Sequence, residues 1–378
     1  MKICVIQYNL GATSETFLTR HINLLKHQFD VSCITGKIHN SKILDASKTY
    51  EYTKVKYIDL LYNRLLFRLN KSSYIYSNSI FKGIKKIQPD LIVFQFAFLP
   101  VLCYTKVAEL DIPFVIIHHG TDLNNARLDK AYHNKLKLVW KHAKSVVFVS
   151  RFLYDEALKL GLDKNKAEVI YLGVPIKKVE ERVKKDKQFN ILTIGRLVAV
   201  KNQAFLVKAF KIFNNLYPNS KLTIIGDGPL KDNITVLIKE LGLSNNVFLT
   251  GALAFSQVES YIDKADVFCL TSKKVLLTNS CQEEGLGLTL IEASLRKVPL
   301  IGTKSGGIPE VISHTENGLL VDSDNTKELF KALEYLHLNP KKAKAMGEKA
   351  YEIVLKKFDE NSQIEEFVKV YKGTSKDV

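Results

Sequence analysis

Apolar runs that do not alternate with polar residues constrain the fold of this chain more than any other feature of its sequence. In the first half they are Lys2–Gln7, Val31–Thr35, Leu91–Phe96, Phe114–His118 and Ser145–Ser150. A strand that is apolar at every position is buried on both faces, which is typical of parallel sheets covered by helices. Helices are predicted at Asn124–Ala143 and Phe152–Leu160. The first half is therefore predicted to be a doubly wound α/β domain.

The same alternation restarts in the second half of the chain. The predicted strands there are Ile191–Gly195, Lys221–Gly226, Val247–Thr250, Val267–Thr271 and Pro299–Thr303, and the predicted helices are Gln203–Asn214, Leu230–Leu241 and Leu286–Arg296. Between the halves, residues 177–187 hold six basic and three acidic residues, which is typical of a linker. Two doubly wound units joined in this way are expected to face each other across a ligand cleft at the carboxyl ends of their strands.

The formal net charge of +16 favours anionic partners: nucleic acid, an acidic membrane surface or phosphorylated small molecules. Much of the excess lies between Lys54 and Lys86, where eight basic residues accompany one acidic residue and aromatic residues are interleaved. One interpretation of this segment is a solvated face of helices that pack on the first domain. The other is a docking surface for an anionic membrane, because basic and aromatic side chains suit the interfacial layer.

The cysteines and the apolar content indicate where the protein works. Five cysteines, an odd number without CxxC spacing, predict reduced thiols, and Cys4, Cys33 and Cys269 fall in strand-like runs. The apolar start, Ile3–Ile6, is too short for a signal peptide, and no run approaches the roughly 18 apolar residues of a membrane span. We expect a cytoplasmic protein, or one that is peripheral on the inner face of the plasma membrane.

The segment Gln282–Ser294, QEEGLGLTLIEAS, places two carboxylates eight residues apart, at Glu284 and Glu292. If it is helical throughout, they lie about 80° apart around the axis and about 12 Å apart along it. That separation exceeds the roughly 5–9.5 Å of a glycosidase pair, so an acid/base couple is not predicted. It suits two carboxylates that bind hydroxyls of one extended ligand, with helix amides between them for an anion. A buried glutamate paired with a cation, and a loop glutamate that caps the helix, would fit the spacing equally well.

Two further groups of candidate site residues follow predicted strands. Arg196 and Lys201 follow the first strand of the second half, where a guanidinium and an ammonium beside a helix start can bind two phosphates. An ordinary exposed pair of cations would look the same. In the first half, His118, His119 and Gly120 follow a buried strand. A single histidine at a strand end is more often structural than functional.

These motifs resemble those of the retaining glycosyltransferases of family 4, which have the two-domain GT-B fold. Glu284 and Glu292 resemble the family's Glu-x7-Glu motif, and Arg196 and Lys201 have the spacing of the pair that it places on the donor diphosphate. His119 resembles the histidine that faces the donor sugar, while His118 is expected to point away. The resemblance implies a first domain at 1–175, a linker at 176–188, a second domain at 189–355 and a final helix, 356–378, that crosses back to the first domain.

The resemblance also implies the residues of the site. Catalytic roles fall to His119, Glu284, Arg196 and Lys201, and donor binding to Gly11, Arg196, Lys201, Leu253, Glu284, Gly285, Leu286, Gly287 and Glu292. The chain departs from the family at Asn202, where glycine is usual, and at Leu286, where an aromatic residue is frequent. The Gly-Gly turn at 305–310 matches the family's turn below the donor, and the segments 14–17 and 272–283 resemble its exopolysaccharide and capsule branch.

A family 4 member is expected to be a hexosyltransferase that moves a sugar from a UDP- or GDP-sugar to a glycan or lipid-linked acceptor, here in bacterial surface polysaccharide synthesis. Cations and helix amides stabilise the leaving diphosphate in this family, so neither a metal nor another cofactor is expected. The alternative is a basic nucleic-acid-binding or dinucleotide-binding α/β protein without transferase activity. Against it, no GxGxxG turn follows a strand, and the basic cluster matches no recognisable RNA or DNA module, so no nucleic acid partner is expected.

Overall fold

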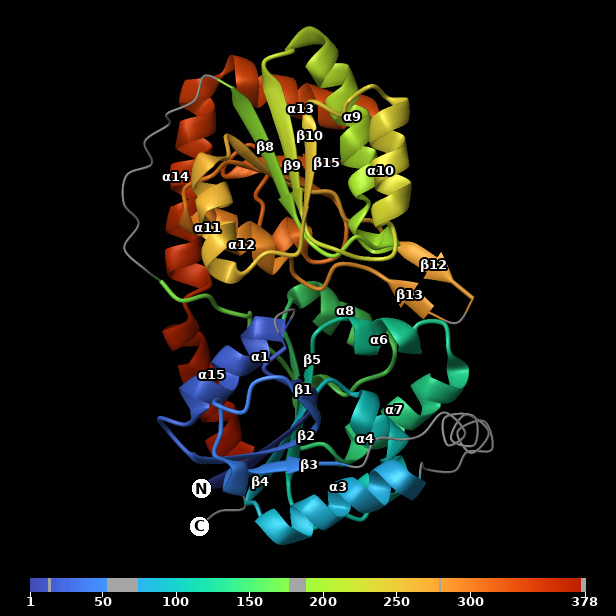
Figure 1. Cartoon of the computed structure of the whole chain (residues 1–378). Coiled ribbons are helices and arrows are strands. Elements are labelled where there is room, and N and C mark those ends of the chain that lie inside the picture. The colour runs from blue at the N-terminus through green and yellow to red at the C-terminus, as the bar shows by residue number, and fades with distance from the viewer. Residues whose placement is uncertain (13–14, 53–73, 177–187, 279, 375–378) are drawn as a thin grey trace. The chain divides into compact units, whose positions relative to one another are not determined.

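The computed structural model describes residues 1–12, 15–52, 74–176, 188–278 and 280–374 (Figure 1). Contacts divide the chain into two compact units. The first comprises Met1–Leu172, Leu277–Cys281 and Glu360–Val378, and the second comprises Gly173–Leu276 and Gln282–Asp359. Residues 177–187 of the predicted linker, and residues 54–73 of the basic segment, lie outside the described ranges.

The first unit contains a parallel sheet of seven strands in the order β3-β2-β1-β4-β5-β6-β7. The strands are β1 (Lys2–Leu10), β2 (Asp30–Ile38), β3 (Thr49–Glu51), β4 (Leu91–Gln95), β5 (Phe114–His118), β6 (Ser145–Phe148) and β7 (Ala167–Val169). Every residue of β4, β5 and β6 is buried, as their apolar runs predicted. The strand order reverses between β1 and β4, which is where ligands of such sheets bind.

Helices cover both faces of this sheet. They are α1 (Thr16–Leu25), α3 (Tyr74–Ile87), α4 (Phe98–Leu102), α5 (Tyr104–Ala108), α6 (Thr121–Ala126), α7 (Lys130–His142), α8 (Arg151–Lys159) and α15 (Glu360–Thr374), with 3-10 turns η2 (Ala46–Lys48) and η3 (Lys164–Lys166). The prediction of one helix at 124–143 was wrong: Asp129 starts α7 by accepting a hydrogen bond from the Tyr132 amide at 3.0 Å. None of the helices within the described ranges is long and apolar enough to span a bilayer.

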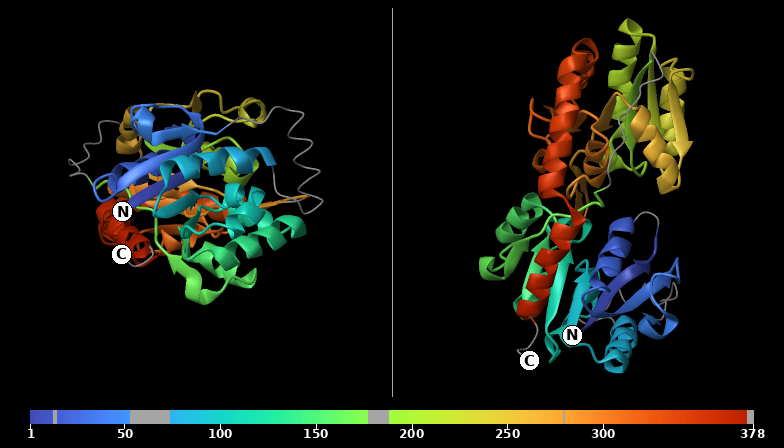
Figure 2. Two further views of the ribbon diagram at one scale, coloured as in Figure 1. Left: turned by 90° about the horizontal axis from the view of Figure 1, so that it is seen from below. Right: turned by 90° about the vertical axis from the view of Figure 1, so that its left-hand side faces the viewer.

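The helix α15 belongs to the first unit although it ends the chain (Figure 2). It packs on α1, where the Tyr371 hydroxyl lies 3.0 Å from Nε2 of His21 and the Phe367 ring contacts the same imidazole at 4.6 Å. Tyr371 and Phe367 are fully buried. The last helix therefore completes the core of the first unit.

The second unit contains a parallel sheet of six strands in the order β10-β9-β8-β11-β14-β15. The strands are β8 (Phe189–Ile194), β9 (Ser220–Ile225), β10 (Val247–Gly251), β11 (Val267–Leu270), β14 (Leu300–Thr303) and β15 (Gly318–Val321). A separate hairpin, β12 (Val275–Leu277) and β13 (Ser280–Gln282), lies in what was predicted to be a loop. The order reverses between β8 and β11.

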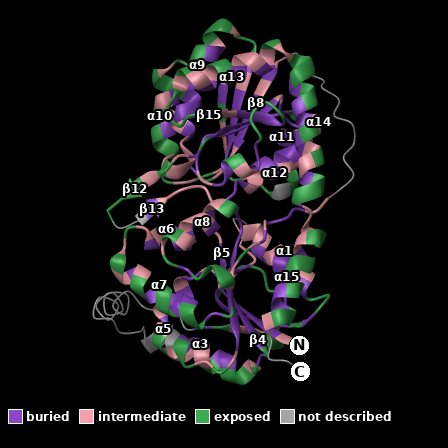
Figure 3. Ribbon diagram, turned by 180° about the vertical axis from the view of Figure 1, so that it is seen from behind, coloured by how far each residue is buried: buried purple, intermediate pink, exposed green. Residues whose placement is uncertain are grey.

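Six helices surround the second sheet. They are α9 (Gln203–Leu216), α10 (Lys231–Glu240), α11 (Phe255–Lys264), α12 (Leu288–Leu295), α13 (Thr326–Leu338) and α14 (Pro340–Lys357), with 3-10 turns η4 (Ala199–Lys201) and η5 (Ile308–Glu310). Figure 1 shows α9 and α10 on one side of the strands and α11, α12 and α14 on the other. Figure 3 shows the strands of each sheet buried and the outer faces of the helices exposed.

Candidate functional site

Polar side chains gather at the carboxyl ends of the strands of the second sheet, where its order reverses. Arg196 follows β8, Ser272 follows β11, and the turn Ser305–Gly307 follows β14. Because parallel strands end at one edge of a sheet, these loops lie together there. The contacts below join them to the loop that carries Glu284.

Glu284 and Lys201 form an ion pair, with Nζ of Lys201 2.6 Å from Oε2 of Glu284. The side chains are only 14% and 19% exposed, respectively. The Ser272 hydroxyl donates to the same oxygen at 2.7 Å. Burial by itself would raise the pKa of Glu284, but the charge and hydrogen bond of Lys201, the Ser272 hydroxyl and the charge of Arg196 together lower it. The carboxylate is therefore ionised at neutral pH, and its other oxygen, Oε1, has no hydrogen-bond partner within the described ranges.

The backbone around Lys201 is fixed by its neighbours. The Thr271 hydroxyl donates a hydrogen bond to the Lys201 carbonyl at 3.2 Å. Asn202 has a left-handed conformation with φ of 52° and ψ of 40°. Glycine adopts this conformation most readily, and asparagine is among the few other residues that tolerate it. The departure from the family's usual glycine therefore preserves the backbone at this point.

Arg196 is exposed, and its guanidinium has no hydrogen bond or ion pair to any residue in the described parts of the chain. Its backbone is held, because Gln203 Nε2 donates to the Arg196 carbonyl at 3.0 Å and the Leu197 amide donates to the Asp227 carbonyl at 2.9 Å. A cation on a fixed backbone, near an ionised carboxylate and without a protein partner, is well placed to bind an anion.

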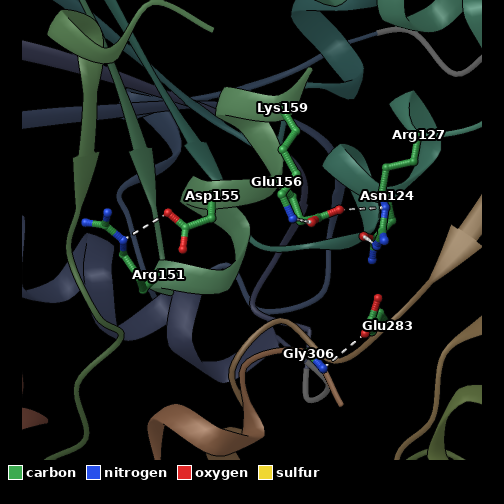
Figure 4. A network of polar contacts seen from close by, with 8 residues as sticks. All are labelled: Asn124, Arg127, Arg151, Asp155, Glu156, Lys159, Glu283 and Gly306. Atoms are coloured by element: carbon green, nitrogen blue, oxygen red, sulfur yellow. Dashed lines mark hydrogen bonds and ion pairs between the residues drawn. The ribbon is translucent and has the colours of Figure 1, made fainter. Parts of the chain in front are cut away.

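The Gly306–Gly307 turn supports the loop that carries Glu284. The Gly307 amide donates to the Glu284 carbonyl at 3.0 Å, and Oε1 of Glu283 accepts from the Gly306 amide at 3.1 Å (Figure 4). A Cβ at Gly306 would lie 2.0 Å from the Glu284 carbonyl oxygen, and one at Gly307 would lie 2.3 Å from that of Gly285. Only glycine lets the two backbones approach this closely.

In the first unit, His119 lies at the end of β5 with its ring between those of Phe17 and Phe96, whose centroids are 4.8 and 4.6 Å away. Nε2 lies 2.8 Å from Oε1 of Gln95, at the end of β4. Burial lowers the pKa of His119 to about 4, the charge of Asp122 opposes this shift and His118 adds to it. The imidazole is therefore neutral at pH 7.

His118 has other partners than His119. It is fully buried, stacks on Phe148, and its Nδ1 lies 2.8 Å from Oδ2 of Asp122. Trp140 Nε1 donates to its Nε2 at 3.0 Å. Burial would raise the pKa of Asp122, but His118 and the Ala97 amide outweigh burial and lower it. Because Asp122 also accepts from the Gly120 amide at 3.2 Å, it anchors the turn after β5.

An ion pair joins α8 to the end of α6 (Figure 4). Oε2 of Glu156 in α8 lies 3.0 Å from Nε of Arg127, and Oε1 lies 2.7 Å from Nζ of Lys159. Arg127 Nη1 donates to Oδ1 of Asn124 in α6 at 3.3 Å. Arg127 and Glu156 are each only 14% exposed, and Lys159 alone is solvent-exposed. All of these partners lie within the first unit, so we assign the contacts to the fold.

Two family models match the chain. The model described as "Glycosyl transferases group 1" matches residues 176–353, and the model described as "Glycosyltransferase Family 4" matches residues 19–178. Together they span most of both units. The chain is a family 4 glycosyltransferase. The match confirms the resemblance seen in the motifs.

Individual proteins agree with this assignment. An uncharacterized glycosyltransferase of Haemophilus influenzae is 22% identical, over 96% of this chain and 96% of its own. The N-acetylgalactosamine-N,N'-diacetylbacillosaminyl-diphospho-undecaprenol 4-alpha-N-acetylgalactosaminyltransferase of Campylobacter jejuni is 26% identical, over 92% of this chain and 93% of its own. The crystal structure of Anabaena HepE in complex with UDP and glucose has a TM-score of 0.78 at 18% identity, over 99% of this chain and 100% of that chain. The fold is GT-B, and nothing in these matches supports the alternative of a nucleic-acid-binding or dinucleotide-binding protein.

In this glycosyltransferase, the structure places Arg196, Lys201 and Glu284 at one edge of the second sheet. Gly11 follows β1 with a left-handed φ of 79°, and Leu253 is half-buried between β10 and α11. Leu286 is only 3% exposed, so its side chain belongs to the core. Ser272 was not predicted, although a polar residue directly after a buried strand is a signal that could have found it.

The helical geometry assumed for Glu284 and Glu292 was wrong. Gly287 has a left-handed φ of 92°, and α12 begins only at Leu288. Gly285 and Glu284 therefore belong to the loop, whereas Glu292 lies half-buried in the helix. The two carboxylates are not related by one helical axis, so the estimate of about 12 Å along it does not apply.

The chain contains one Asp-x-Asp triplet, Asp322-Ser323-Asp324, directly after β15. Such triplets hold the metal in some metal-dependent glycosyltransferases, so its contacts matter. Oδ1 of Asp322 lies 2.8 Å from Nζ of Lys304, and Oδ1 of Asp324 lies 3.2 Å from Nζ of Lys273. Both carboxylates are thus already paired with lysines, and the triplet by itself is no argument for a metal site.

Proposed function

We propose that this glycosyltransferase moves a hexose, with retention of configuration, from a UDP- or GDP-sugar to a glycan or lipid-linked acceptor in bacterial surface polysaccharide synthesis. One observation carries the donor assignment. The guanidinium of Arg196, which has no partner among the residues that the structure describes, lies at the strand end beside the Lys201–Glu284 pair. Together the three side chains supply two cations and an acceptor oxygen at one place. A nucleotide sugar needs this combination, because it presents a diphosphate next to sugar hydroxyls.

We assign the role of each residue from its charge and from its capacity to form further hydrogen bonds. Arg196 and Lys201 bind the diphosphate, and Oε1 of Glu284 accepts a hydrogen bond from a sugar hydroxyl, while Glu292 binds the ribose. When the bond to the sugar breaks, negative charge grows on the leaving diphosphate, and fixed cations stabilise it by about 3–4 kcal/mol each. We propose that these cations replace a metal ion and that no cofactor takes part. The leaving phosphate helps to deprotonate the acceptor, which attacks from the same face.

A panel of nucleotide sugars tests this proposal. The purified chain is incubated with UDP- and GDP-sugars, and both the release of nucleoside diphosphate and the rise in melting temperature are measured. One nucleotide series is expected to stabilise the protein and to be hydrolysed slowly without an acceptor. If no nucleotide or nucleotide sugar stabilises the protein or is consumed, the proposed function is wrong.

Glu292→Gln is expected to weaken UDP or GDP binding by about tenfold or more, because a hydrogen bond to a charged group contributes about 1.5–3 kcal/mol. Calorimetric titration with the nucleotide alone measures the change. Glu240→Gln, which removes an exposed carboxylate from α10, is the matched control and should bind normally. Equal affinities for the two variants would remove Glu292 from the ribose site.

The acceptor proposal is supported by the Campylobacter jejuni relative, whose name includes a diphospho-undecaprenol acceptor. We propose that the present protein works at the inner face of the plasma membrane, and its five cysteines, all buried thiols, suit a reducing compartment. In the described part of the basic segment, Lys82, Lys85 and Lys86 are exposed on α3 while Ile80 and Ile84 are buried. That pattern suits both interpretations of the segment.

Liposome sedimentation distinguishes the two interpretations. We expect binding that needs anionic lipid, decreases with salt, and is lost in the triple variant Arg64→Glu, Arg68→Glu and Lys85→Glu, since each cation near such a surface contributes about 1 kcal/mol. The triple variant Lys208→Glu, Lys341→Glu and Lys344→Glu changes the net charge equally in the second unit and should still bind. Binding to neutral vesicles, or identical behaviour of the two variants, would leave only a solvated surface.

A further inference from the structure

The two ring nitrogens of His119 have different surroundings. Nε2 lies 2.8 Å from Oε1 of Gln95, and this carbonyl oxygen can only accept a hydrogen bond. The proton of the neutral ring is therefore on Nε2. Nδ1 is buried and has no hydrogen-bond partner in the described parts of the chain. A buried acceptor without a partner destabilises the fold, and such a group calls for an explanation.

Aromatic rings pack against the imidazole of His119. The rings of Phe17 and Phe96 contact the imidazole at 4.8 and 4.6 Å and are tilted by 46° and 51°. Phe96 has a φ of 74°, in the left-handed region that an aromatic residue rarely adopts. Backbone strain of this kind is typical of functional sites, and here the strained residue places its ring against His119. Gln95 itself is only 1% exposed, so its amide is fixed as well.

The neighbouring histidine is held in the opposite tautomer. Trp140 Nε1 is always a donor, so Nε2 of His118, 3.0 Å away, accepts and carries no proton. Its proton is therefore on Nδ1, which lies 2.8 Å from Oδ2 of the Asp122 carboxylate. Asp122 is thereby engaged by His118 rather than by His119. The amide of Gln95 is left as the partner that sets the protonation of His119.

We propose that Gln95 is a positioning residue, which holds His119 in the Nε2–H tautomer so that the bare Nδ1 accepts a hydrogen bond from a hydroxyl of the substrate. The substrate half of this proposal rests on the proposed function, whereas the tautomer does not. Because Nδ1 is buried, the binding of the hydroxyl has to uncover it. The unpaired acceptor then gains the partner that the protein does not supply.

The tautomer can be measured without any substrate. In protein labelled with 15N-histidine, a proton–nitrogen correlation spectrum at neutral pH distinguishes protonated from bare ring nitrogens. His119, assigned by the signals lost in His119→Gln, is expected to show a protonated Nε2 and a bare Nδ1, and His118 the reverse. A protonated Nδ1 on His119, or a mixture of the two tautomers, would overturn the proposal.

Two variants test the role of Gln95. Gln95→Leu removes the acceptor, so His119 should become a mixture of tautomers, and kcat should decrease by about tenfold with little change in the KM for the donor. Gln95→Glu keeps an acceptor and should preserve the tautomer. Its added charge should raise the pKa of His119, which Asp122 and His118 also influence. Protonation of Nδ1 would then remove activity as the pH falls from 7 to 6, whereas wild-type activity should show no titration of His119 there.

Gln7→Leu is the matched control. Gln7 is a fully buried glutamine in the neighbouring strand β1, and its Nε2 donates to the Asn9 carbonyl at 2.7 Å. Its loss should leave the His119 signals unchanged. If Gln95→Leu also leaves them unchanged, Gln95 does not position the ring. Should Gln95→Leu fail to fold, the wild-type spectrum and the pH profile of Gln95→Glu still decide the matter. If the spectrum shows the predicted tautomer but the protein consumes no nucleotide sugar, the proposed function is wrong and the assignment of the tautomer still holds.

Discussion

Arg196→Met is expected to lower kcat for sugar transfer by about 10²–10³-fold, equivalent to about 3–4 kcal/mol of transition-state stabilisation. The guanidinium is exposed and has no partner in the described parts of the chain, so its removal disturbs no contact of the fold. The lost interaction is instead the one with charge that develops on the leaving diphosphate. The melting temperature without ligand should change by no more than about 2 °C, as for other surface substitutions.

Steady-state kinetics on the donor found in the nucleotide-sugar panel measure this effect. Lys208→Met, which removes an exposed cation from α9 in the same unit, is the matched control and should retain normal turnover. Arg196→Lys should recover only part of the rate, because an ammonium cannot bind a phosphate in bidentate fashion. Near-normal kcat in Arg196→Met would show that the donor site has been assigned wrongly.

Glu284→Gln is expected to abolish measurable transfer, since it removes both the charge that orients Lys201 and a strong acceptor for the sugar hydroxyl. Lys201→Met removes the other partner of the ion pair. The Glu284 carboxylate, which is only 14% exposed, then keeps its hydrogen bond from the Ser272 hydroxyl but loses its cation. This should destabilise the second unit by about 1–3 kcal/mol. The double variant should be more stable than Lys201→Met, because it removes the uncompensated charge as well.

The pH dependence of stability provides the corresponding test. The pKa of Glu284 in the folded protein is lowered from its ordinary value of 4.5, so the unfolded chain binds this proton more tightly. The stabilisation by the pair is therefore present above pH 4.5 and is lost as the pH falls through the lowered value. Thermal unfolding of wild type and Glu284→Gln between pH 7 and pH 3 should show a difference that shrinks on acidification. A difference that stays constant would mean that the ion pair does not stabilise the fold.

Several features could be predicted from the sequence because their causes are local. Continuous apolar runs identified β5 at its observed bounds, and the other central strands to within a few residues, since burial on both faces requires apolar side chains at every position. The Arg196–Lys201 and Glu284–Glu292 motifs could likewise be recognised from their spacing in the sequence, because each motif lies within one strand–loop–helix connection. The short edge strands β3 and β7 escaped prediction. Each of these strands has only three residues, too few to show a pattern of apolar positions, and its pairing depends on a neighbouring strand.

The tertiary structure alone decided which of these groups meet. Lys201 and Glu284 are 83 residues apart in sequence, and Gln95 and His119 are 24 apart. Their contacts depend on strand order: β8 lies next to β11, and β4 next to β5, so loops that are distant along the chain end at the same edge. The sequence showed the residues that can carry charge or a proton. Their protonation states follow from burial and from partners at 2.6–2.8 Å, which exist only once the sheets are formed.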